Sequence, residues 1–259
     1  MMRYLQEQCE LIYKEEIANG IFSFTLKAPQ IAAKATCGQF VNILCDPFEL
    51  RRPISIGGFD AKTGILRLVF EIRGKGTDWL AARNEGDVLD LLGPLGHGFP
   101  LLEESKKAVM IGGGIGTPPL LPLCRHYGEN ATLISGFRNA SAVILEDDAK
   151  AFGAKTVVCT DDGSYGFAGF TTQALEAELA NGTFDVVYTC GPKVMMRKVA
   201  ELAAKYGILC YVSMEERMAC GVGACLGCAC KTKAEDGSTA MKRVCVNGPV
   251  FEASEVDLT

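Results

Sequence analysis

The sequence of 259 residues has little histidine, no excess of positive charge and no long apolar run. Its two histidines, His97 and His126, lie far apart, so a histidine-rich metal site is not expected. Lysine and arginine number 26 against 31 acidic residues, a net charge of −5, whereas nucleic-acid-binding proteins normally present a basic face. The longest apolar stretch, residues 108–123, is broken by three consecutive glycines and three prolines and is too short for a membrane span. We therefore expect binding neither to nucleic acid nor to a membrane.

Nothing at the N-terminus predicts export. Residues 1–10 contain no apolar signal core, so we expect a cytoplasmic protein with reduced thiols and no disulfides. The count of 12 cysteines is nevertheless high. Seven of them stand singly among apolar residues and are expected to be small buried side chains: Cys9, Cys37, Cys45, Cys124, Cys159, Cys190 and Cys210.

Four other cysteines form the most informative motif. Cys220, Cys225 and Cys228, followed by Cys245, have the C-x4-C-x2-C…C spacing of plant-type ligands to a [2Fe–2S] cluster. Structural zinc, the main alternative, usually takes two C-x2-C knuckles or includes histidine, and only one such knuckle is present. The nearby Cys230 is expected to approach the cluster without binding it, because the four ligand positions are already filled. Three loop glycines are expected to take positive φ angles and let the backbone wrap the cluster: Gly221, Gly223 and Gly227.

Two regions of contrasting periodicity precede this motif. Over the first hundred residues, short alternating segments are separated by glycine or proline, a pattern typical of an antiparallel β barrel. After a turn-rich segment at residues 93–100, strands and helices alternate, which predicts a Rossmann-like parallel sheet. We predict three domains: a barrel over residues 1–100, an α/β nucleotide domain over 101–212 and a small cluster module over 213–259.

The expected elements of these domains are short. The predicted barrel strands cover residues 21–26, 38–44, 65–72 and 86–92, with Leu66, Leu68, Phe70 and Ile72 on one face. The predicted strands of the α/β domain cover residues 108–111, 131–135, 155–159 and 185–189. One helix is expected to be capped by Thr171 or Thr172, and another to carry an apolar stripe of Val194, Met195, Val199, Leu202 and Ala203.

The barrel region contains two features suited to phosphate. Arg52-Pro53-Ile54-Ser55 is expected at the end of a strand, where an arginine fork can bind pyrophosphate and the Ser55 hydroxyl can hydrogen-bond an isoalloxazine edge. Gly76 and Thr77 follow another strand, and Thr77 is expected as the N-cap of a helix whose free N–H groups can bind an anion. A surface arginine pair and a plain turn are the alternatives. The two features together favour a flavin cofactor.

Two glycine turns follow strands of the α/β domain. The first contains Gly113, Gly114, Gly116 and Thr117, and the second contains Cys190, Gly191, Pro192 and, further along, Met195. Because parallel-sheet proteins bind ligands at the carboxyl ends of strands, both turns are expected to face one nucleotide-binding cleft. Tight turns without a ligand are the alternative. The choice between NAD and NADP stays open, because Arg138 follows the second strand and no acidic residue there plainly selects a ribose hydroxyl.

The barrel and nucleotide motifs together resemble the ferredoxin–NADP reductase superfamily over about residues 1–212. With Glu215-Glu-Arg-Met-Ala-Cys-Gly-Val-Gly-Ala-Cys225 and residues 243–251 added, nearly the whole chain is similar to the electron-transfer subunits of class 1B, NAD-dependent, dihydroorotate dehydrogenase. This resemblance implies FAD, a [2Fe–2S] cluster and NAD as cofactors. It implies an FAD site made of Arg52 to Ser55, Val69, Phe70, Glu71, Gly76 and Thr77.

The same resemblance implies a partner and a place in metabolism. The partner is the FMN-containing catalytic subunit that oxidises dihydroorotate to orotate, in a heterotetramer with two subunits of each kind. The implied function is to pass electrons from that FMN through the cluster and FAD to NAD+, in the de novo biosynthesis of pyrimidines (UMP). No residue of this chain is then assigned a catalytic role. Glu215 or Glu216 either approaches the nicotinamide or flavin edge or belongs to a solvated linker.

Three other functions compete with this interpretation. The small subunit of an NADH-dependent ferredoxin–NADP oxidoreductase shares the barrel and cluster, but an aspartate commonly replaces the first cysteine in that family, whereas this chain has Cys220. The reductase component of an oxygenase often carries a longer ferredoxin domain than the residues available after Ser213. A non-enzymatic protein on the same scaffold is expected to lose the phosphate-binding motifs, which are intact here.

Overall fold

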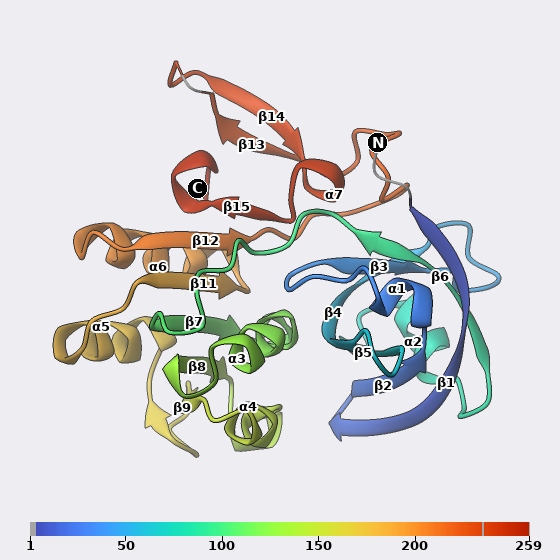
Figure 1. The fold of residues 1–259 in the computed structure, drawn as a ribbon, viewed down its shortest axis with the longest axis horizontal. Helices are drawn as coiled ribbons and strands as arrows, with labels where there is room; N and C mark the ends of the chain where they lie inside the picture. Colours follow the sequence, from blue (N-terminus) through green and yellow to red (C-terminus); the bar gives the residue numbers. More distant parts are fainter. Residues whose placement is uncertain (1–3, 235, 259) are drawn as a thin grey trace.

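The computed structural model describes residues 4–234 and 236–258, which form a barrel, an α/β layer and a small hairpin module (Figure 1). The barrel is closed by six antiparallel strands in the order β1-β2-β5-β4-β3-β6. These strands are β1 (Leu5–Ala18), β2 (Ile21–Lys27), β3 (Phe40–Ile43), β4 (Arg52–Asp60), β5 (Ile65–Glu71) and β6 (Val88–Leu95). Two short helices accompany them, α1 (Pro29–Ala32) and α2 (Lys75–Ala81).

Apolar alternation places the barrel core largely as predicted. Leu66, Leu68 and Phe70 of β5 are fully buried or nearly so and point into the barrel. Ile72 was expected on the same face, but it lies beyond the end of β5 and is 38% exposed. Arg52 was expected at the end of a strand and instead begins β4. The strand β1, which the sequence interpretation missed, carries many charged residues because most of its outer face meets solvent.

The α/β layer is built on a seven-stranded sheet in the order β10-β9-β8-β7-β11-β12-β15. All of its strand pairs are parallel except β12 with β15. The strands are β7 (Ala108–Gly113), β8 (Ala131–Phe137), β9 (Lys155–Thr160), β10 (Phe167–Ala168), β11 (Val186–Cys190), β12 (Leu209–Ser213) and β15 (Val250–Glu252). The prediction of a barrel followed by a parallel-sheet α/β layer is therefore confirmed.

Helices cover both faces of this sheet because its strands are apolar on both sides. Val109 and Ile111 of β7 belong to the core beneath α5 (Thr171–Asn181) and α6 (Lys193–Lys205). Ala108 and Met110 belong to the core beneath α3 (Leu121–Tyr127) and α4 (Glu146–Ala151). Within the described part of the chain, five short 3-10 turns complete the connections: Gly114–Gly116, Pro118–Leu120, Gly128–Asn130, Ala140–Ala142 and Ala253–Glu255.

Two helix predictions need correction. The N-cap of α5 is Phe170, whose backbone N–H is bound by the side chain of Gln173, and not Thr171 or Thr172. In α6 the buried positions are Met196, Val199 and Ala203, whereas Val194 of the predicted stripe is 59% exposed. The buried face of α6 is thus rotated around the helix axis relative to the predicted apolar stripe.

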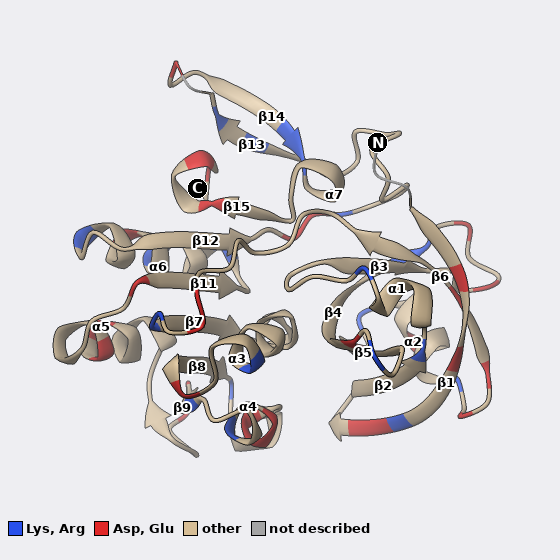
Figure 2. Cartoon of the chain, in the orientation of Figure 1, with Lys and Arg blue, Asp and Glu red and all other residues tan. Residues whose placement is uncertain are grey.

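The chain after β12 makes the cluster loop and then returns to the sheet. The hairpin β13 (Ala229–Lys233) and β14 (Thr239–Arg243) leads into α7 (Val244–Asn247), and β15 then pairs with β12 (Figure 1). Acidic and basic residues are interspersed over the elements (Figure 2). Among the residues described, no helix is long and apolar enough to cross a membrane.

Candidate cofactor and cluster sites

The four motif cysteines lie together, paired two by two. The backbone N–H of Cys225 donates to the Cys220 sulfur at 3.4 Å, and that of Cys245 donates to the Cys228 sulfur at 3.5 Å. Over residues 4–234 and 236–258, no three His, Cys, Asp or Glu side chains are placed to hold one metal ion. Two pairs of thiols suit a binuclear cluster, because each of its irons takes two protein ligands.

The loop around Cys220 favours a thiolate. Burial raises the pKa of this thiol, but the backbone N–H groups of Val222, Cys225 and Ala224 outweigh that effect and lower the pKa to about 7. Successive N–H groups that converge on one point are a common feature of sites for anions and iron–sulfur clusters. Cys245 is the opposite case, because burial and the neighbouring Cys228 raise the pKa of its thiol to about 12.

Two of the three loop glycines have the predicted conformation. Gly221 has a φ of +68° and Gly223 a φ of +80°, where a side chain is strained. A Cβ on Gly221 would lie 2.1 Å from the Asn42 side-chain nitrogen, so this glycine also makes room for the barrel. Gly227 is not among the residues with positive φ, and that prediction is wrong for it.

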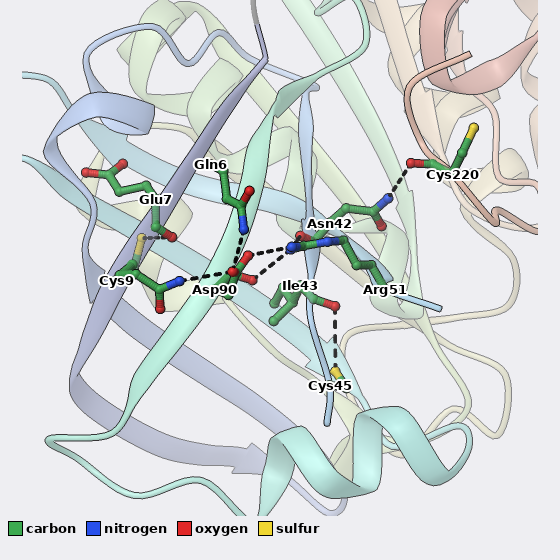
Figure 3. A network of polar contacts seen from close by, with 10 residues as sticks. Gln6, Glu7, Cys9, Asn42, Ile43, Cys45, Arg51, Asp90 and Cys220 are labelled. Atoms are coloured by element: carbon green, nitrogen blue, oxygen red, sulfur yellow. Dashed lines mark hydrogen bonds and ion pairs between the residues drawn. The ribbon is translucent and has the colours of Figure 1, made fainter. Parts of the chain in front are cut away.

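A polar network links the barrel to the cluster loop (Figure 3). The Asp90 carboxylate accepts hydrogen bonds from Gln6 at 2.6 Å and Gln8 at 2.9 Å and pairs with Arg51 at 2.6 Å. Arg51 also donates to the backbone carbonyl of Asn42 at 3.2 Å. The Asn42 side chain in turn reaches the Cys220 carbonyl at 3.5 Å.

Asn42 is the one buried link in this network that faces the cluster loop. Its side chain is fully buried, and among the residues described its Oδ1 has no hydrogen-bond partner. A buried polar atom without a partner is unusual and often marks a functional site. Cys230 was predicted to lie near the cluster without binding it, and its side chain is buried, with 4% exposure. Burial raises the pKa of its thiol, and the charges of Glu216 and Cys228 add to this effect.

A first cleft of about 210 Å³ lies where the barrel meets the α/β layer. Eight residues predicted for FAD or for the nucleotide turn line it: Pro53, Ile54, Ser55, Val69, Phe70, Glu71, Thr77 and Cys190. Its mixture of apolar walls and a few polar groups is typical of a cofactor site. We call this space the flavin cleft.

Arg52 and Gly76 form a second part of the same region. A Cβ on Gly76 would lie 2.1 Å from the Arg52 Nε, so only glycine lets the guanidinium lie against the first turn of α2. Thr77 is not the N-cap, which is Gly74; its hydroxyl instead accepts hydrogen bonds from the N–H groups of Arg73 at 2.8 Å and Gly74 at 3.2 Å. A guanidinium and a tightened glycine turn together fit a pyrophosphate.

A second cleft, of about 790 Å³, follows the carboxyl ends of the parallel strands. Of the residues predicted for NAD, those that line it are Gly113, Gly114, Gly116, Gly191, Pro192 and Met195. A Cβ on Gly113 would lie 2.8 Å from Pro192, so the two glycine turns contact each other as expected. We call this space the nucleotide cleft. Thr117 lies outside its lining, is fully buried and packs against Gly112.

The two clefts meet at Glu215, which lines both. Its side chain is accessible to solvent, yet the cleft walls desolvate it and raise the pKa of its carboxyl, an effect that the Arg73 guanidinium opposes. Cys190 lies on the flavin side, and burial, followed by the charge of Glu215, raises the pKa of its thiol to about 12. Glu216 lines the flavin cleft and pairs with Lys193 at 3.2 Å.

Comparison with known proteins agrees with this geometry. The profile of the iron–sulfur cluster binding domain of dihydroorotate dehydrogenase B matches residues 215–257. The electron transfer subunit of dihydroorotate dehydrogenase B (NAD+) of Geobacillus thermodenitrificans is 42% identical, covering 98% of this chain and 99% of the relative. The subunit of the same name from Fusobacterium nucleatum is 39% identical, covering 97% and 98%. The chain belongs to this family of electron-transfer subunits.

Solved structures extend the comparison to the fold. The structure of an NADH-dependent reduced ferredoxin-NADP oxidoreductase superposes with a TM-score of 0.85 at 30% identity, covering 97% of this chain and 90% of that chain. The ferredoxin reductase of carbazole 1,9a-dioxygenase gives a TM-score of 0.69 at 21% identity, covering 80% and 67%, and shows the fold alone. The resemblance to the electron-transfer subunits that the motifs suggest is confirmed by the sequence identity to those subunits and by the matching cluster-binding profile.

Sequence reasoning missed several cleft residues of this electron-transfer subunit. Arg73 lines both clefts, and Asp161 and Phe170 line the nucleotide cleft. Asp161 follows β9 rather than β8, so a search confined to the end of the second strand passes over it. Arg73 lies two residues after the end of β5, and a position close to the end of a barrel strand was a signal that could have found it.

Proposed function

We propose that this chain passes electrons from the oxidation of dihydroorotate to NAD+, as the electron-transfer subunit of dihydroorotate dehydrogenase B, in de novo pyrimidine biosynthesis. Its catalytic partner is the FMN-containing dihydroorotate-oxidising subunit, with two subunits of each kind in the complex. The observation that carries this proposal is the junction of the flavin and nucleotide clefts in a chain that also bears four paired cysteines. The similar proteins from Geobacillus and Fusobacterium are electron transfer subunits of dihydroorotate dehydrogenase B (NAD+), which supports the same activity.

The residues present fit three groups. Cys220, Cys225, Cys228 and Cys245 would hold a [2Fe–2S] cluster. Arg52 and Gly76 would hold the FAD pyrophosphate, with Ser55 and the β5 residues Val69, Phe70 and Glu71 along the flavin. The glycine turns at Gly113 and Gly191 would hold NAD(H). When bound, the flavin supplies one- or two-electron chemistry, which couples a one-electron cluster to a two-electron nicotinamide.

The chain itself contributes placement and charge. Arg52 would neutralise phosphate charge. Glu215 would place a carboxylate at this junction, beside a nicotinamide ring that is positively charged in NAD+ and loses that charge when it accepts hydride. We also propose a place in the cytoplasm, where cysteines outside the cluster stay reduced.

A second candidate is the small subunit of an NADH-dependent ferredoxin–NADP oxidoreductase, because the structure of such an enzyme superposes on this chain with a TM-score of 0.85. The identity of 42% to the dihydroorotate dehydrogenase subunit, against 30% to that structure, favours the first proposal.

The test is reconstitution with the catalytic subunit encoded by the same organism. We expect the two chains to co-purify and the complex to reduce NAD+ when dihydroorotate is added. The isolated chain should oxidise NADH with an artificial dye but do nothing with dihydroorotate. Full dihydroorotate activity of the chain alone, or a complex that reduces only ferredoxin, would contradict the proposal.

A further inference from the structure

Two successive peptide groups of the cluster loop connect a cysteine sulfur to a side chain outside the loop. In a trans peptide group, the carbonyl of one residue and the N–H of the next point in opposite directions. The N–H of Gly223 hydrogen-bonds to the Cys245 sulfur, and the N–H of Ala224 hydrogen-bonds to the Cys220 sulfur. The carbonyls of these two peptide groups belong to Val222 and Gly223, and they therefore face away from the sulfurs.

Each of these carbonyls is bound by a side chain from a different part of the fold. The hydroxyl of Tyr4, which directly precedes β1 of the barrel, donates to the Val222 carbonyl at 3.4 Å. The guanidinium of Arg243, the last residue of β14, donates to the Gly223 carbonyl. The barrel thus holds one of the sulfur-bound peptide groups, and the hairpin holds the other.

The place where Arg243 meets the loop is well defined. The N–H of the next residue, Val244, donates to the Cys228 carbonyl at 2.9 Å, which joins the end of the hairpin to the loop. A Cβ on Gly223 would lie 2.9 Å from Val246 Cγ1 and 3.5 Å from Arg243 Nη1. The absence of a side chain at Gly223 therefore lets the loop pack against α7 and the guanidinium together.

Hydrogen bonds to the sulfurs and the net charge around an iron–sulfur cluster both set its reduction potential. A donor on the carbonyl of a peptide group polarises that group and strengthens the hydrogen bond that its N–H makes on the other side. Tyr4 supplies a neutral hydroxyl, whereas Arg243 supplies a full positive charge. Because reduction adds one negative charge to a cluster, a nearby cation also favours the reduced state directly.

We propose that Tyr4 and Arg243 raise the reduction potential of the cluster by polarising the two peptide groups on either side of Gly223. Arg243 has the larger effect, because it acts through its charge as well as through its hydrogen bond. Both are positioning residues, since they act on the sulfurs through the loop backbone. The inference rests on the proposed function, in which the four cysteines hold a [2Fe–2S] cluster.

The test is a redox titration of the full chain, loaded with FAD and the cluster and followed by the electron paramagnetic resonance signal of the reduced cluster. In Arg243→Gln we expect the equilibrium constant for cluster reduction to fall about tenfold, a downward shift of about 59 mV for a one-electron couple. Arg243→Lys keeps the charge and should stay within about twofold of the wild type. Tyr4→Phe removes only the hydroxyl and should lower the constant about threefold.

Lys231→Gln is the matched control, because Lys231 is an exposed cation on β13 of the same hairpin and water screens its charge. It should leave the potential unchanged. An unchanged potential in Arg243→Gln overturns the proposal. An equal shift in Lys231→Gln also overturns it, because net charge alone would then set the potential. Equal shifts in Arg243→Gln and Arg243→Lys would do the same, because the guanidinium shape and not its charge would then matter.

Ala224→Glu decides the question if Arg243→Gln does not retain the cluster. Ala224 is exposed and directly follows Gly223, so a carboxylate there neutralises the guanidinium while Arg243 stays in place. The constant should fall about tenfold relative to Ala224→Gln, and equal potentials in these two variants overturn the proposal. A wild-type chain that takes up no [2Fe–2S] cluster contradicts the proposed function itself, whereas a loaded cluster whose potential is independent of Arg243 contradicts only this inference.

Discussion

At the residue scale, Glu215 is important because it places a carboxyl group where the flavin and nucleotide clefts meet. It lines both clefts, and the desolvation of its carboxyl raises its pKa above the ordinary glutamate value. A raised pKa means that the charged form is lost at a higher pH than usual as the solution is acidified. A carboxylate here stabilises the positive charge that develops on the nicotinamide during hydride transfer, whereas the protonated acid does not.

Glu215→Gln should therefore change both the rate and its pH dependence. We expect kcat for NADH oxidation with dye to fall about tenfold near neutral pH, since one electrostatic contact at the transition state is lost. In the wild type, the rate should fall as pH drops through the raised pKa, and this acidic limb should vanish in the variant. Steady-state kinetics across pH measure both effects.

Glu201→Gln serves as the control for this prediction, because Glu201 is an exposed carboxylate on α6 that lines neither cleft. It should keep the wild-type profile. An acidic limb that persists unchanged in Glu215→Gln would remove Glu215 from the junction chemistry.

Residues differ in how well sequence alone finds them. The four cluster cysteines could be predicted because three lie within nine residues and their spacing is itself the signal. Asn42 could not, because its importance comes from a contact with Cys220, 178 residues away. Asp161 and Phe170 were missed for a similar reason, since strand order brings their turns to the cleft.

At the scale of elements, β3 of the barrel supports the cluster loop. Arg51 holds the backbone of Asn42 and Asp90 at 3.2 and 3.1 Å, and thereby joins β3 to β6. The Asn42 side chain then reaches Cys220, and Gly221 fits closely against it. The strand that begins with Arg52, the predicted phosphate ligand, pairs with this same β3. The position of the first cluster ligand is thus coupled to the flavin-binding strand.

Asn42→Ala should loosen this coupling. Removing the buried amide takes away its contact with the Cys220 carbonyl and leaves a small cavity, so we expect the cluster to be lost to a chelator about fivefold faster. The electron paramagnetic resonance signal of the reduced cluster should broaden as Cys220 gains freedom. The time course of visible absorbance measures the loss of the cluster.

Asn130→Ala is the comparison, because the Asn130 side chain also donates one hydrogen bond to a backbone carbonyl, that of Glu104 at 3.0 Å, in the α/β layer. It should leave cluster loss and the spectrum unchanged. Identical cluster loss in Asn42→Ala and wild type would show that β3 does not support the loop.

Apolar periodicity predicted strands and helices where one of their faces is buried, but it did not predict the residues at which they begin and end. The alternation in β5 gave its buried face correctly, but Ile72 fell outside the strand. Thr77 and Thr171 looked like N-caps by residue type, yet the caps are Gly74 and Phe170, because a glutamine or threonine three residues on binds the cap backbone. The long β1 escaped prediction since its exposed face is dense in charge.

At the scale of the whole molecule, the function depends on how the barrel, the α/β layer and the cluster module meet. Arg67 of β5 forms an ion pair with Asp148 of α4, which ties the barrel to the layer, and it also donates to Ser23 of β2 at 2.9 Å. β15 pairs with β12 and anchors the cluster module to the sheet. The barrel and the parallel sheet were readable from periodicity and the cluster module from the cysteine spacing. The return of β15 to the sheet was not readable, because a three-residue strand carries no period.

The central claim is that the cluster connects this chain to its partner while FAD alone serves NADH. Cys225→Ser tests it most directly in the reconstituted complex, with Cys230→Ser as control for a neighbouring buried cysteine. We predict that Cys225→Ser keeps NADH-to-dye activity within about twofold but loses dihydroorotate-dependent NAD+ reduction by at least about a hundredfold. Cys230→Ser should keep both activities. Equal loss of both activities in Cys225→Ser, or retention of both, would contradict the account.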